Sequence, residues 1–349
     1  MAKKIAVLHS QVPFARGGAE IMVENLTREL RQRGYQAEIV ALPFKWYPVN
    51  TLLDSYLLWR TLDLTESNGQ RIDLVISTKV PSFMVPHPNK VTWLMHQYRA
   101  AYDLQNDIPA GGLNTLPGGQ DVQARIKAMD ILGIGESKAV YSISGNVSQR
   151  LKTFNGLDAT PLYHPPALAG HYEAGEFGDY ILSVGRLEQN KRIDLLIRAL
   201  PYCDSHIQVK IAGRGPEMES FKALAENLGV ADRVSLLGFV PDDDIIKLYA
   251  GALGVCYPPL DEDYGYVTLE SFLSRKPILT CRDSGGVLEF ARDGENSYIA
   301  DFDPQQMGAC FDKLYRDKRR ARDMGQNGYE LVKDINWDSV IDALTRTLK

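Results

Sequence analysis

Short apolar runs alternate with longer amphipathic segments along almost the whole chain, and this rhythm constrains the fold more than any other feature. Runs of strand length followed by segments of helix length predict repeated β–α–β units, with parallel strands and helices on both faces of the sheet. The first repeat is typical: residues 4–9 predict a strand, residues 18–33 predict a helix, and Gly34 ends that helix. We therefore expect an α/β protein.

The pattern runs through the chain twice. In the first half, a helix is expected at residues 145–154, and further strands are expected at residues 37–42, 73–77, 91–95 and 140–144. The second half predicts strands at residues 180–184, 207–212, 234–237, 253–257, 277–280 and 297–300. Helices are expected between them, at residues 192–200, 216–228, 242–250 and 267–274. Proline and glycine interrupt residues 163–175, which we interpret as a linker.

A chain of 349 residues suits two domains better than one. We predict one Rossmann-like domain over residues 1–168 and a second over residues 178–332. Residues 333–349 are expected to form a C-terminal helix that packs back on the first domain. Two doubly wound parallel sheets facing a central cleft would bind ligands beyond the carboxyl ends of their strands.

Charge and cysteine content exclude several classes of protein. The net charge of −5 gives no basic field for nucleic acid. Basic residues 28–33 and 318–322 predict solvated helix faces, with a landing patch for an anionic membrane as the alternative. No structural zinc site or disulfide framework is expected, because the cysteines lie far apart, at Cys203, Cys256, Cys281 and Cys310. The chain shows neither a signal peptide nor a membrane span, so we expect a cytoplasmic location.

Two glutamates follow the strand expected at residues 253–257. Glu262 falls in the loop, and Glu270 lies about one turn into the next helix. A helix start offers unpaired N–H groups and partial positive charge, which suit a phosphate, and Gly265 lets the backbone approach a ligand. The carboxylate in the helix could bind the two hydroxyls of a ribose, and the one in the loop could bind sugar hydroxyls. An ordinary acidic loop before a helix is the alternative.

Two cations follow the strand expected at residues 180–184. Arg186 and Lys191 could hold a diphosphate leaving group between them. Negative charge builds on such a group as its bond breaks, so fixed cations there would stabilise the transition state. The alternative is a surface turn in which Lys191 is solvated.

Taken together, these motifs resemble those of the family-four glycosyltransferases, a large group of retaining enzymes with the GT-B fold. Glu262 and Glu270 are similar to the E-x7-E signature of that family, and Gly185-Arg186 with Lys191 is similar to its G-R-x4-K signature. Further matches are the stretch at residues 211–217, the stretch at residues 237–240 whose backbone reads the base in the family, and the glycine turn at residues 283–289. The resemblance runs from residue 180 to about residue 300 in order and spacing.

The first half of the chain resembles the family more loosely. Gly17 and Gly18 match its glycine loop, with a plain turn as the alternative. His96 ends a strand where the family holds an active-site histidine, which implies contact with the transferred sugar. A capped surface histidine is the alternative. Residues in the predicted helix at 145–154 are candidates of second rank, namely Asn146, Ser148 and Arg150.

The resemblance implies a definite set of site residues. Catalysis would involve His96, Arg186, Lys191 and Glu262. The nucleotide diphosphate sugar would be bound by Gly17, Gly18, Gly185, Gly213, Gly215, Phe239, Val240, Tyr264, Gly265, Tyr266, Val267 and Glu270. Tyr264 and Tyr266 stand where the family has other residues, so they put the donor sugar in doubt. Residues 97–119 predict either a mobile acceptor loop or an insertion.

The implied activity is the retaining transfer of a sugar to an acceptor hydroxyl on a glycan or lipid-linked glycan, as in cell-envelope polysaccharide synthesis. In that family the acceptor hydroxyl attacks from the face that the leaving diphosphate occupies. The reaction uses no protein nucleophile, metal or cofactor. Peripheral contact with the inner face of the membrane is expected if the acceptor is a lipid. Asp261 and Asp263 form a D-x-D that could instead bind a metal ion. A nucleotide-sugar epimerase, a glycan phosphorylase and a non-catalytic nucleotide-sugar sensor are three rival hypotheses, since fold alone does not fix function.

Overall fold

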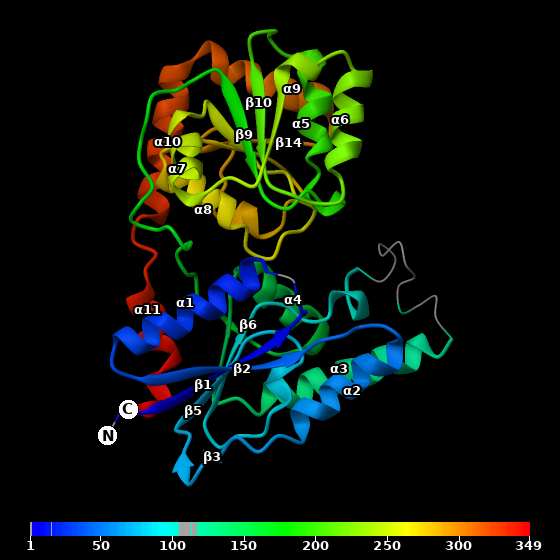
Figure 1. Ribbon diagram of the computed structural model, residues 1–349, viewed down its shortest axis with the longest axis vertical. Helices are drawn as coiled ribbons and strands as arrows, with labels where there is room; N and C mark the ends of the chain where they lie inside the picture. Colours follow the sequence, from blue (N-terminus) through cyan, green and yellow to red (C-terminus); the bar gives the residue numbers. More distant parts are fainter. Residues whose placement is uncertain (1, 15, 105–112, 114–116) are drawn as a thin grey trace. The chain divides into compact units, whose positions relative to one another are not determined.

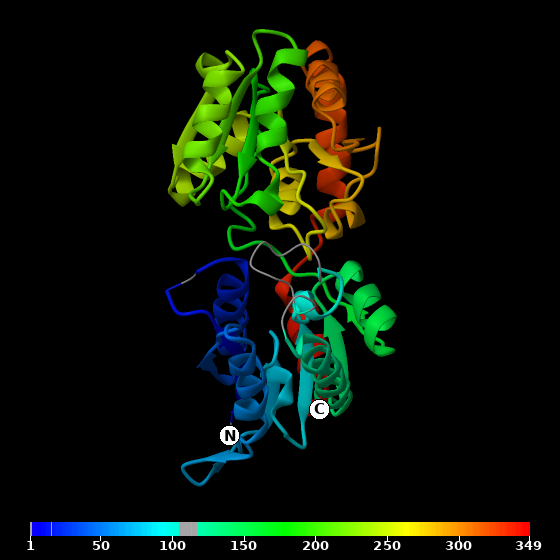
Figure 2. The same ribbon diagram turned by 90° about the vertical axis from the view of Figure 1, so that its right-hand side faces the viewer.

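The computed structural model describes residues 2–14, 16–104, 113 and 117–349 (Figure 1). The chain divides into two compact units. Unit 1 comprises Met1–Ala167 and Asn336–Lys349, and unit 2 comprises Leu168–Ile335. Each unit contains a six-stranded sheet whose paired strands are parallel, with helices on both faces (Figure 2). The predicted α/β class with two Rossmann-like domains is confirmed.

The sheet of unit 1 has the strand order β2-β1-β5-β6-β7-β8. Its strands are β1 (Lys4–Gln11), β2 (Gln36–Pro43), β5 (Leu74–Ser77), β6 (Lys90–Leu94), β7 (Ala139–Ser142) and β8 (Thr160–Pro161). Its helices are α1 (Gly18–Gln32), α2 (Val49–Arg60), α3 (Gly119–Gly135), α4 (Gly145–Asn155) and α11 (Trp337–Leu344). Strands β5 and β6 are buried along their whole length because helices cover both faces, which explains their continuous apolar runs.

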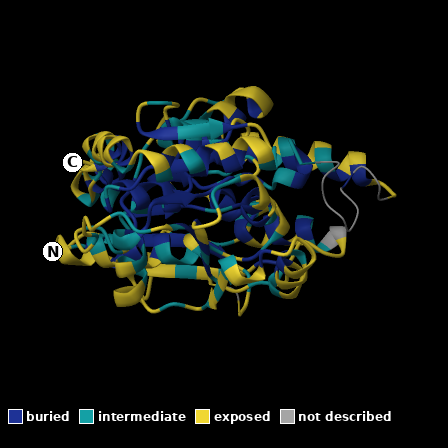
Figure 3. Cartoon of the chain, turned by 90° about the horizontal axis from the view of Figure 1, so that it is seen from above, coloured by how far each residue is buried: buried dark blue, intermediate teal, exposed yellow. Residues whose placement is uncertain are grey.

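The sheet of unit 2 has the order β11-β10-β9-β12-β13-β14. Its strands are β9 (Tyr180–Val184), β10 (Gln208–Ala212), β11 (Val234–Gly238), β12 (Gly254–Cys256), β13 (Ile278–Cys281) and β14 (Ser297–Ala300). Its helices are α5 (Asp194–Ala199), α6 (Met218–Asn227), α7 (Asp242–Gly251), α8 (Tyr266–Leu273), α9 (Pro304–Arg316) and α10 (Lys318–Val332). The buried residues lie in and beside the sheets (Figure 3), and they include the free thiols of Cys256 and Cys281.

The sequence predicted the strands of unit 2 and most of those of unit 1, to within about two residues. It missed α2, α3 and the hairpin of β3 (Glu66–Ser67) with β4 (Gln70–Arg71). Helix α2 carries exposed leucines at Leu57 and Leu58 as well as buried ones, so its apolar residues do not form one clear stripe. Residues 105–112 and 114–116 of the expected loop lie outside the described residues, and that expectation stays a prediction.

Helix α11 belongs to unit 1 although the chain reaches it last. Trp337, its first residue, stacks on the His164 ring with 6.0 Å between ring centroids and meets Trp93 edge-on at 6.3 Å. Arg33 at the end of α1 forms an ion pair with Asp338. Burial lowers the pKa of His164 to about 3, so the stacked ring is neutral at ordinary pH.

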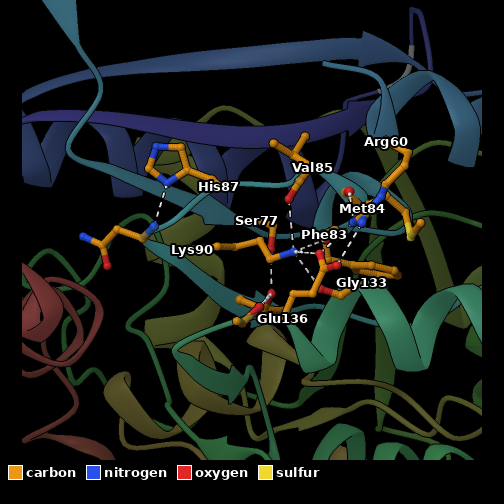
Figure 4. A network of polar contacts seen from close by, with 12 residues as sticks. Arg60, Ser77, Phe83, Met84, Val85, His87, Lys90, Gly133 and Glu136 are labelled. Atoms are coloured by element: carbon orange, nitrogen blue, oxygen red, sulfur yellow. Dashed lines mark hydrogen bonds and ion pairs between the residues drawn. The ribbon is translucent and has the colours of Figure 1, made fainter. Parts of the chain in front are cut away.

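Unit 1 also buries a lysine, Lys90, at the start of β6 (Figure 4). Its ammonium donates to the carbonyl oxygens of Phe83 at 2.8 Å, Val85 at 3.0 Å and Gly133 at 2.8 Å. Glu136, at 3.4 Å, supplies the compensating charge and is itself paired with Arg60. Burial lowers the pKa of Lys90. The lysine thus joins β6, the end of α3 and the turn at residues 82–85.

Among the described residues, no helix is both long and apolar enough to cross a membrane.

Candidate functional site

The candidate residues of unit 2 lie in loops that follow the carboxyl ends of its strands. Because all strands of this sheet run the same way, the loops meet at one edge, where ligands of such sheets bind. Backbone hydrogen bonds join them: Leu187 N–H donates to Arg214 O at 3.0 Å, and Gly213 N–H donates to Gly238 O at 2.7 Å. Leu260 N–H donates likewise to Asn190 O at 2.9 Å. The loops after β9, β10, β11 and β12 therefore form one connected layer.

Three glycines of this layer are required by its geometry. A Cβ atom on Gly213 would lie 1.7 Å from Gly185 O, so no larger residue fits between these two loops. Gly265, the residue before α8, has a φ of +81°, a backbone conformation that residues with a Cβ rarely adopt. Gly215 is also closely packed, because its Cβ would lie 2.2 Å from Leu187 O. The loops after β9 and β10 can thus run side by side only with glycine at positions 213 and 215.

Lys191 and Glu262 form an ion pair between the loop after β9 and the loop after β12. The Tyr257 hydroxyl, at the end of β12, donates to the same Glu262 oxygen at 2.8 Å, and the Lys191 ammonium lies 5.9 Å from the centre of the Tyr257 ring. The Lys191 and Glu262 side chains are only 14% and 20% exposed. Burial and the Glu262 charge raise the pKa of Tyr257, so its hydroxyl remains a hydrogen-bond donor.

Glu270 is held by two tyrosine hydroxyls. Tyr249 of α7 donates to Glu270 Oε2 at 2.6 Å, and Tyr172, from the segment before β9, also donates to this carboxylate. Burial raises the pKa of Glu270, and the two phenols partly offset that rise. Glu270, a half-buried residue, therefore lies about one turn into α8, close to the helix start that follows Gly265.

The remaining predicted residues of unit 2 are placed differently. Arg186 is 62% exposed and pairs with Glu188 at 2.9 Å. Phe239 is also exposed, with the Arg214 guanidinium 5.6 Å from the centre of its ring. Tyr264, in contrast, is buried and packs edge-on against Phe290 at 6.1 Å. The side chains of three further candidates lie around α8 and the end of β11: Val267 is buried, and Val240 and Tyr266 are half-buried.

Sequence reasoning missed an ion pair that closes the layer. Arg192 has a φ of +51° and donates through both terminal nitrogens to Asp283, each at 2.8 Å. Its guanidinium lies 4.6 Å from the centre of the Phe302 ring. Nearby, Asp261 N–H donates to Asp283 O at 2.8 Å, and Gly286 N–H donates to Glu262 O at 2.7 Å. The glycine turn that resembled the family motif therefore supports the loop that carries Glu262.

The candidate residues of unit 1 lie at the carboxyl edge of its own sheet. His96 follows β6, is half-buried, and its Nδ1 contacts Gln97 O at 2.7 Å. Gly17 donates its N–H to the Glu20 carboxylate at 2.8 Å, so the Glu20 side chain caps the start of α1. Arg150 is buried and pairs with Asp103 at 3.1 Å, whereas the Ser148 hydroxyl donates to Ala159 O at 2.6 Å. The structure thus brings glycine loop, histidine and arginine to one edge.

One histidine of this edge was not predicted. His9 lies near the end of β1, is buried, and its Nε2 lies 3.4 Å from Glu20. Burial alone would raise the pKa of Glu20, but hydrogen bonds from His9 and from backbone N–H groups, with the charge of Lys79, lower it to about 2. A histidine inside an apolar strand carries no motif, so only the packing of α1 on β1 reveals the pair.

Within the described part of the chain, no group of three or more His, Cys, Asp or Glu side chains is arranged to hold a metal ion.

Comparison with solved structures identifies the fold as GT-B. Anabaena HepE in complex with UDP and glucose superposes with a TM-score of 0.72, at 15% identity and covering 99% of both chains. WaaG, a glycosyltransferase involved in lipopolysaccharide biosynthesis, superposes with a TM-score of 0.74, at 17% identity, covering 98% of this chain and 99% of that one.

Residues 173–331 match the family described as glycosyl transferases group 1. This part of the chain holds the candidate residues of unit 2, and the resemblance predicted for it is confirmed.

Curated relatives align with a similar part. The D-inositol 3-phosphate glycosyltransferase of Acidothermus cellulolyticus is 29% identical over 180 residues, which cover 48% of this chain and 40% of the relative. A GDP-mannose-dependent alpha-(1-6)-phosphatidylinositol monomannoside mannosyltransferase of Mycolicibacterium smegmatis is 32% identical over 186 residues, covering 50% of this chain and 48% of the relative. The similarity therefore spans less than half the length of these relatives.

Proposed function

We propose that this protein transfers a sugar from a nucleotide diphosphate sugar to an acceptor hydroxyl. The observation that carries the proposal is the Lys191–Glu262 ion pair, which lies at the same sheet edge as Glu270 and the start of α8. It combines a cation for a leaving phosphate with carboxylates for hydroxyl groups, in a segment of the group 1 family. The relatives are named as glycosyltransferases, and HepE was solved with UDP, which supports a nucleotide-linked donor.

Each residue has a distinct part in the proposed reaction. Lys191 and Arg186 stabilise the negative charge that grows on the diphosphate as the glycosidic bond breaks. The start of α8, which carries the positive end of the helix dipole, binds a phosphate oxygen. Glu262 binds hydroxyls of the sugar, and Glu270 binds those of the ribose. The exposed Phe239, with the backbone around Val240, contacts the base.

We further propose that transfer retains the anomeric configuration and needs neither a metal ion nor a cofactor. The acceptor oxygen forms its bond to the anomeric carbon on the face that the diphosphate leaves. The acceptor proton passes to a phosphate oxygen, and the electron pair of the broken bond stays on the diphosphate. His96 contacts the transferred sugar. An NMR assay of the product's anomeric configuration tests this mechanism, because an inverted product excludes it.

For the acceptor, we propose a hydroxyl of a glycan or lipid-linked glycan used in envelope polysaccharide synthesis, handled in the cytoplasm at the inner face of the membrane. The names of the relatives, which include a phosphatidylinositol mannoside mannosyltransferase and a lipopolysaccharide enzyme, support this class. Sedimentation with anionic vesicles tests the membrane contact, and protein that stays in the supernatant would argue against it.

A thermal-shift screen with UDP, GDP, ADP and their sugars tests the donor. A ligand at a hundred times its Kd stabilises the native state by about 2.7 kcal/mol, which is a readily measured shift. Incubation of the donor that binds, with and without glycan acceptors, then separates transfer from epimerisation, which would proceed without an acceptor. A protein that no nucleotide diphosphate stabilises would contradict the proposal.

A further inference from the structure

Two tyrosines approach Glu270 from elements other than its own helix. Tyr249 lies on α7 and is fully buried, and its hydroxyl is 2.6 Å from Glu270 Oε2. Tyr172 lies in the segment at residues 168–178, which precedes β9, and its hydroxyl also donates to Glu270. The two rings meet edge-on, with 5.8 Å between centroids and an angle of 90°. Neither tyrosine lies in one of the motifs that resemble the glycosyltransferase family.

A carboxylate held in this way keeps only part of its hydrogen-bonding capacity. An ionised carboxyl group offers about four acceptor positions, and it has no donor of its own. The two phenols occupy two of these positions and point their protons at the oxygens, which fixes the plane of the group. Two positions then remain, and neighbouring hydroxyls of one ligand could fill them.

The phenols also oppose the effect of burial. Burial raises the pKa of Glu270, and the hydrogen bonds from Tyr249 and Tyr172 lower it. Removing either hydroxyl should therefore raise the pKa of this carboxyl group. Its protonated form would bind a diol less well, because one of its oxygens then carries a proton.

We propose that Tyr172 and Tyr249 are positioning residues for ribose recognition, which hold the Glu270 carboxylate so that its two remaining acceptor positions bind a vicinal diol. The inference rests on the proposed function, because the nucleotide donor supplies the ribose. It assigns a role in the site to residues 168–178. Lys276 anchors the same segment through Gly175 O at 2.8 Å, with its ammonium 3.6 Å from the centre of the Phe177 ring.

The test compares Tyr172→Phe with the wild type by calorimetric titration from pH 5.5 to pH 8. The probes are UDP, GDP and ADP, followed by the 2′,3′-dideoxy form of the one that binds. Tyr180→Phe is the matched control, because the Tyr180 hydroxyl is also half-buried but donates to Leu248 O at 2.7 Å. In activity assays, the donor KM should rise while kcat changes little, since a ribose contact is common to the ground state and the transition state.

The loss of one hydrogen bond to a charged group predicts about tenfold weaker binding of the ribonucleotide to Tyr172→Phe. The deficit should grow as the pH falls, because the Glu270 carboxyl group becomes protonated at a higher pH in the variant. The dideoxy nucleotide should bind the variant and the wild type equally. Tyr249→Phe should behave like Tyr172→Phe, and it replaces that variant if the latter does not fold.

The possible failures are distinguishable. If the wild type binds none of the three nucleotides, the proposed function fails and the inference fails with it. If the wild type binds but both phenylalanine variants bind equally well at every pH, only the inference is overturned. An equal loss for the ribonucleotide and the dideoxy form would also overturn it, because that loss does not depend on the ribose hydroxyls.

Discussion

In both units the first strand lies inside the sheet, with the next one or two strands on one side of it and the later strands on the other. The two units nevertheless use buried charge in different ways. In unit 1, Lys90 is fully buried and directs its three N–H donors at three carbonyl oxygens. In unit 2, Lys191 pairs with Glu262 at the sheet edge and remains 14% exposed. A buried charge whose hydrogen bonds are all made within the protein stabilises the fold. A partly exposed charge can still contact a ligand.

The same contrast holds for the two buried carboxyl groups that accept hydrogen bonds from tyrosines. Asp130 of unit 1 is fully buried and accepts from Tyr56 at 2.8 Å and Tyr102 at 2.6 Å. Glu270 of unit 2 accepts from Tyr249 and Tyr172 but is only half-buried. The family match covers residues 173–331, which lie in unit 2. Similar groups therefore support the fold in one unit and form the candidate site in the other.

The largest expected effect is on the stability of unit 1. Lys90→Met should lower the free energy of unfolding by about 3 to 5 kcal/mol, because it leaves buried carbonyls and the Glu136 charge without their partner. Urea unfolding followed by circular dichroism measures the change. Lys152→Met is the control, since Lys152 is 53% exposed in its pair with Asp158. Equal losses in the two variants would show that burial does not distinguish these lysines.

The next effect concerns the candidate site of unit 2. Lys191→Ala should reduce turnover by about 10²-fold or more, because it removes a charge that acts in the transition state, while donor affinity falls less. Steady-state kinetics with the donor found by thermal shift measure both. Lys247→Ala should leave turnover unchanged, because Lys247 is exposed and pairs with Asp244 within α7. Unchanged turnover in Lys191→Ala would place this lysine outside the reaction.

A smaller effect should appear in the pH dependence of unit 1. Burial raises the pKa of Asp130 to about 7, against about 3.9 in the unfolded chain, although Tyr102 and Tyr56 partly oppose the rise. Between these values the native state binds the proton more tightly, so stability is lost as the pH rises from about 4 to about 7. Asp130→Asn should remove this loss, and its stability relative to the wild type should rise by about 1 to 3 kcal/mol between pH 5 and pH 8. Urea unfolding at several pH values measures it, and parallel curves for the two proteins would refute it.

The last prediction is that removal of metal ions has no effect on turnover. If Lys191 and Arg186 neutralise the diphosphate, EDTA should leave turnover unchanged, and added manganese should not increase it. The assay uses the same donor and acceptor in buffer treated with chelator. Activity that EDTA abolishes and manganese restores would show that a metal ion, and not these cations, neutralises the diphosphate. Asp261 and Asp263 would then be the first residues to substitute.

Local pattern was sufficient to predict most of the fold and the core of the candidate site. The strand at residues 180–184, the glycines around Gly213 and the spacing of Glu262 and Glu270 are all readable within short windows of sequence. The structure places these residues in adjoining loops because parallel strands end at one edge of a sheet. Helices α2 and α3 were missed because their burial depends on partners elsewhere in the chain, such as Tyr56 with Asp130.

By itself, the sequence determined the alternation of strand and helix, the two-unit plan and the order of the motifs, because periodicity, glycine and spacing act through neighbouring residues. Only the tertiary structure decided which side chains support the site. Tyr172 and Tyr249 reach Glu270 from separate segments. Such pairings depend on the order of strands in the sheet, which no local window contains.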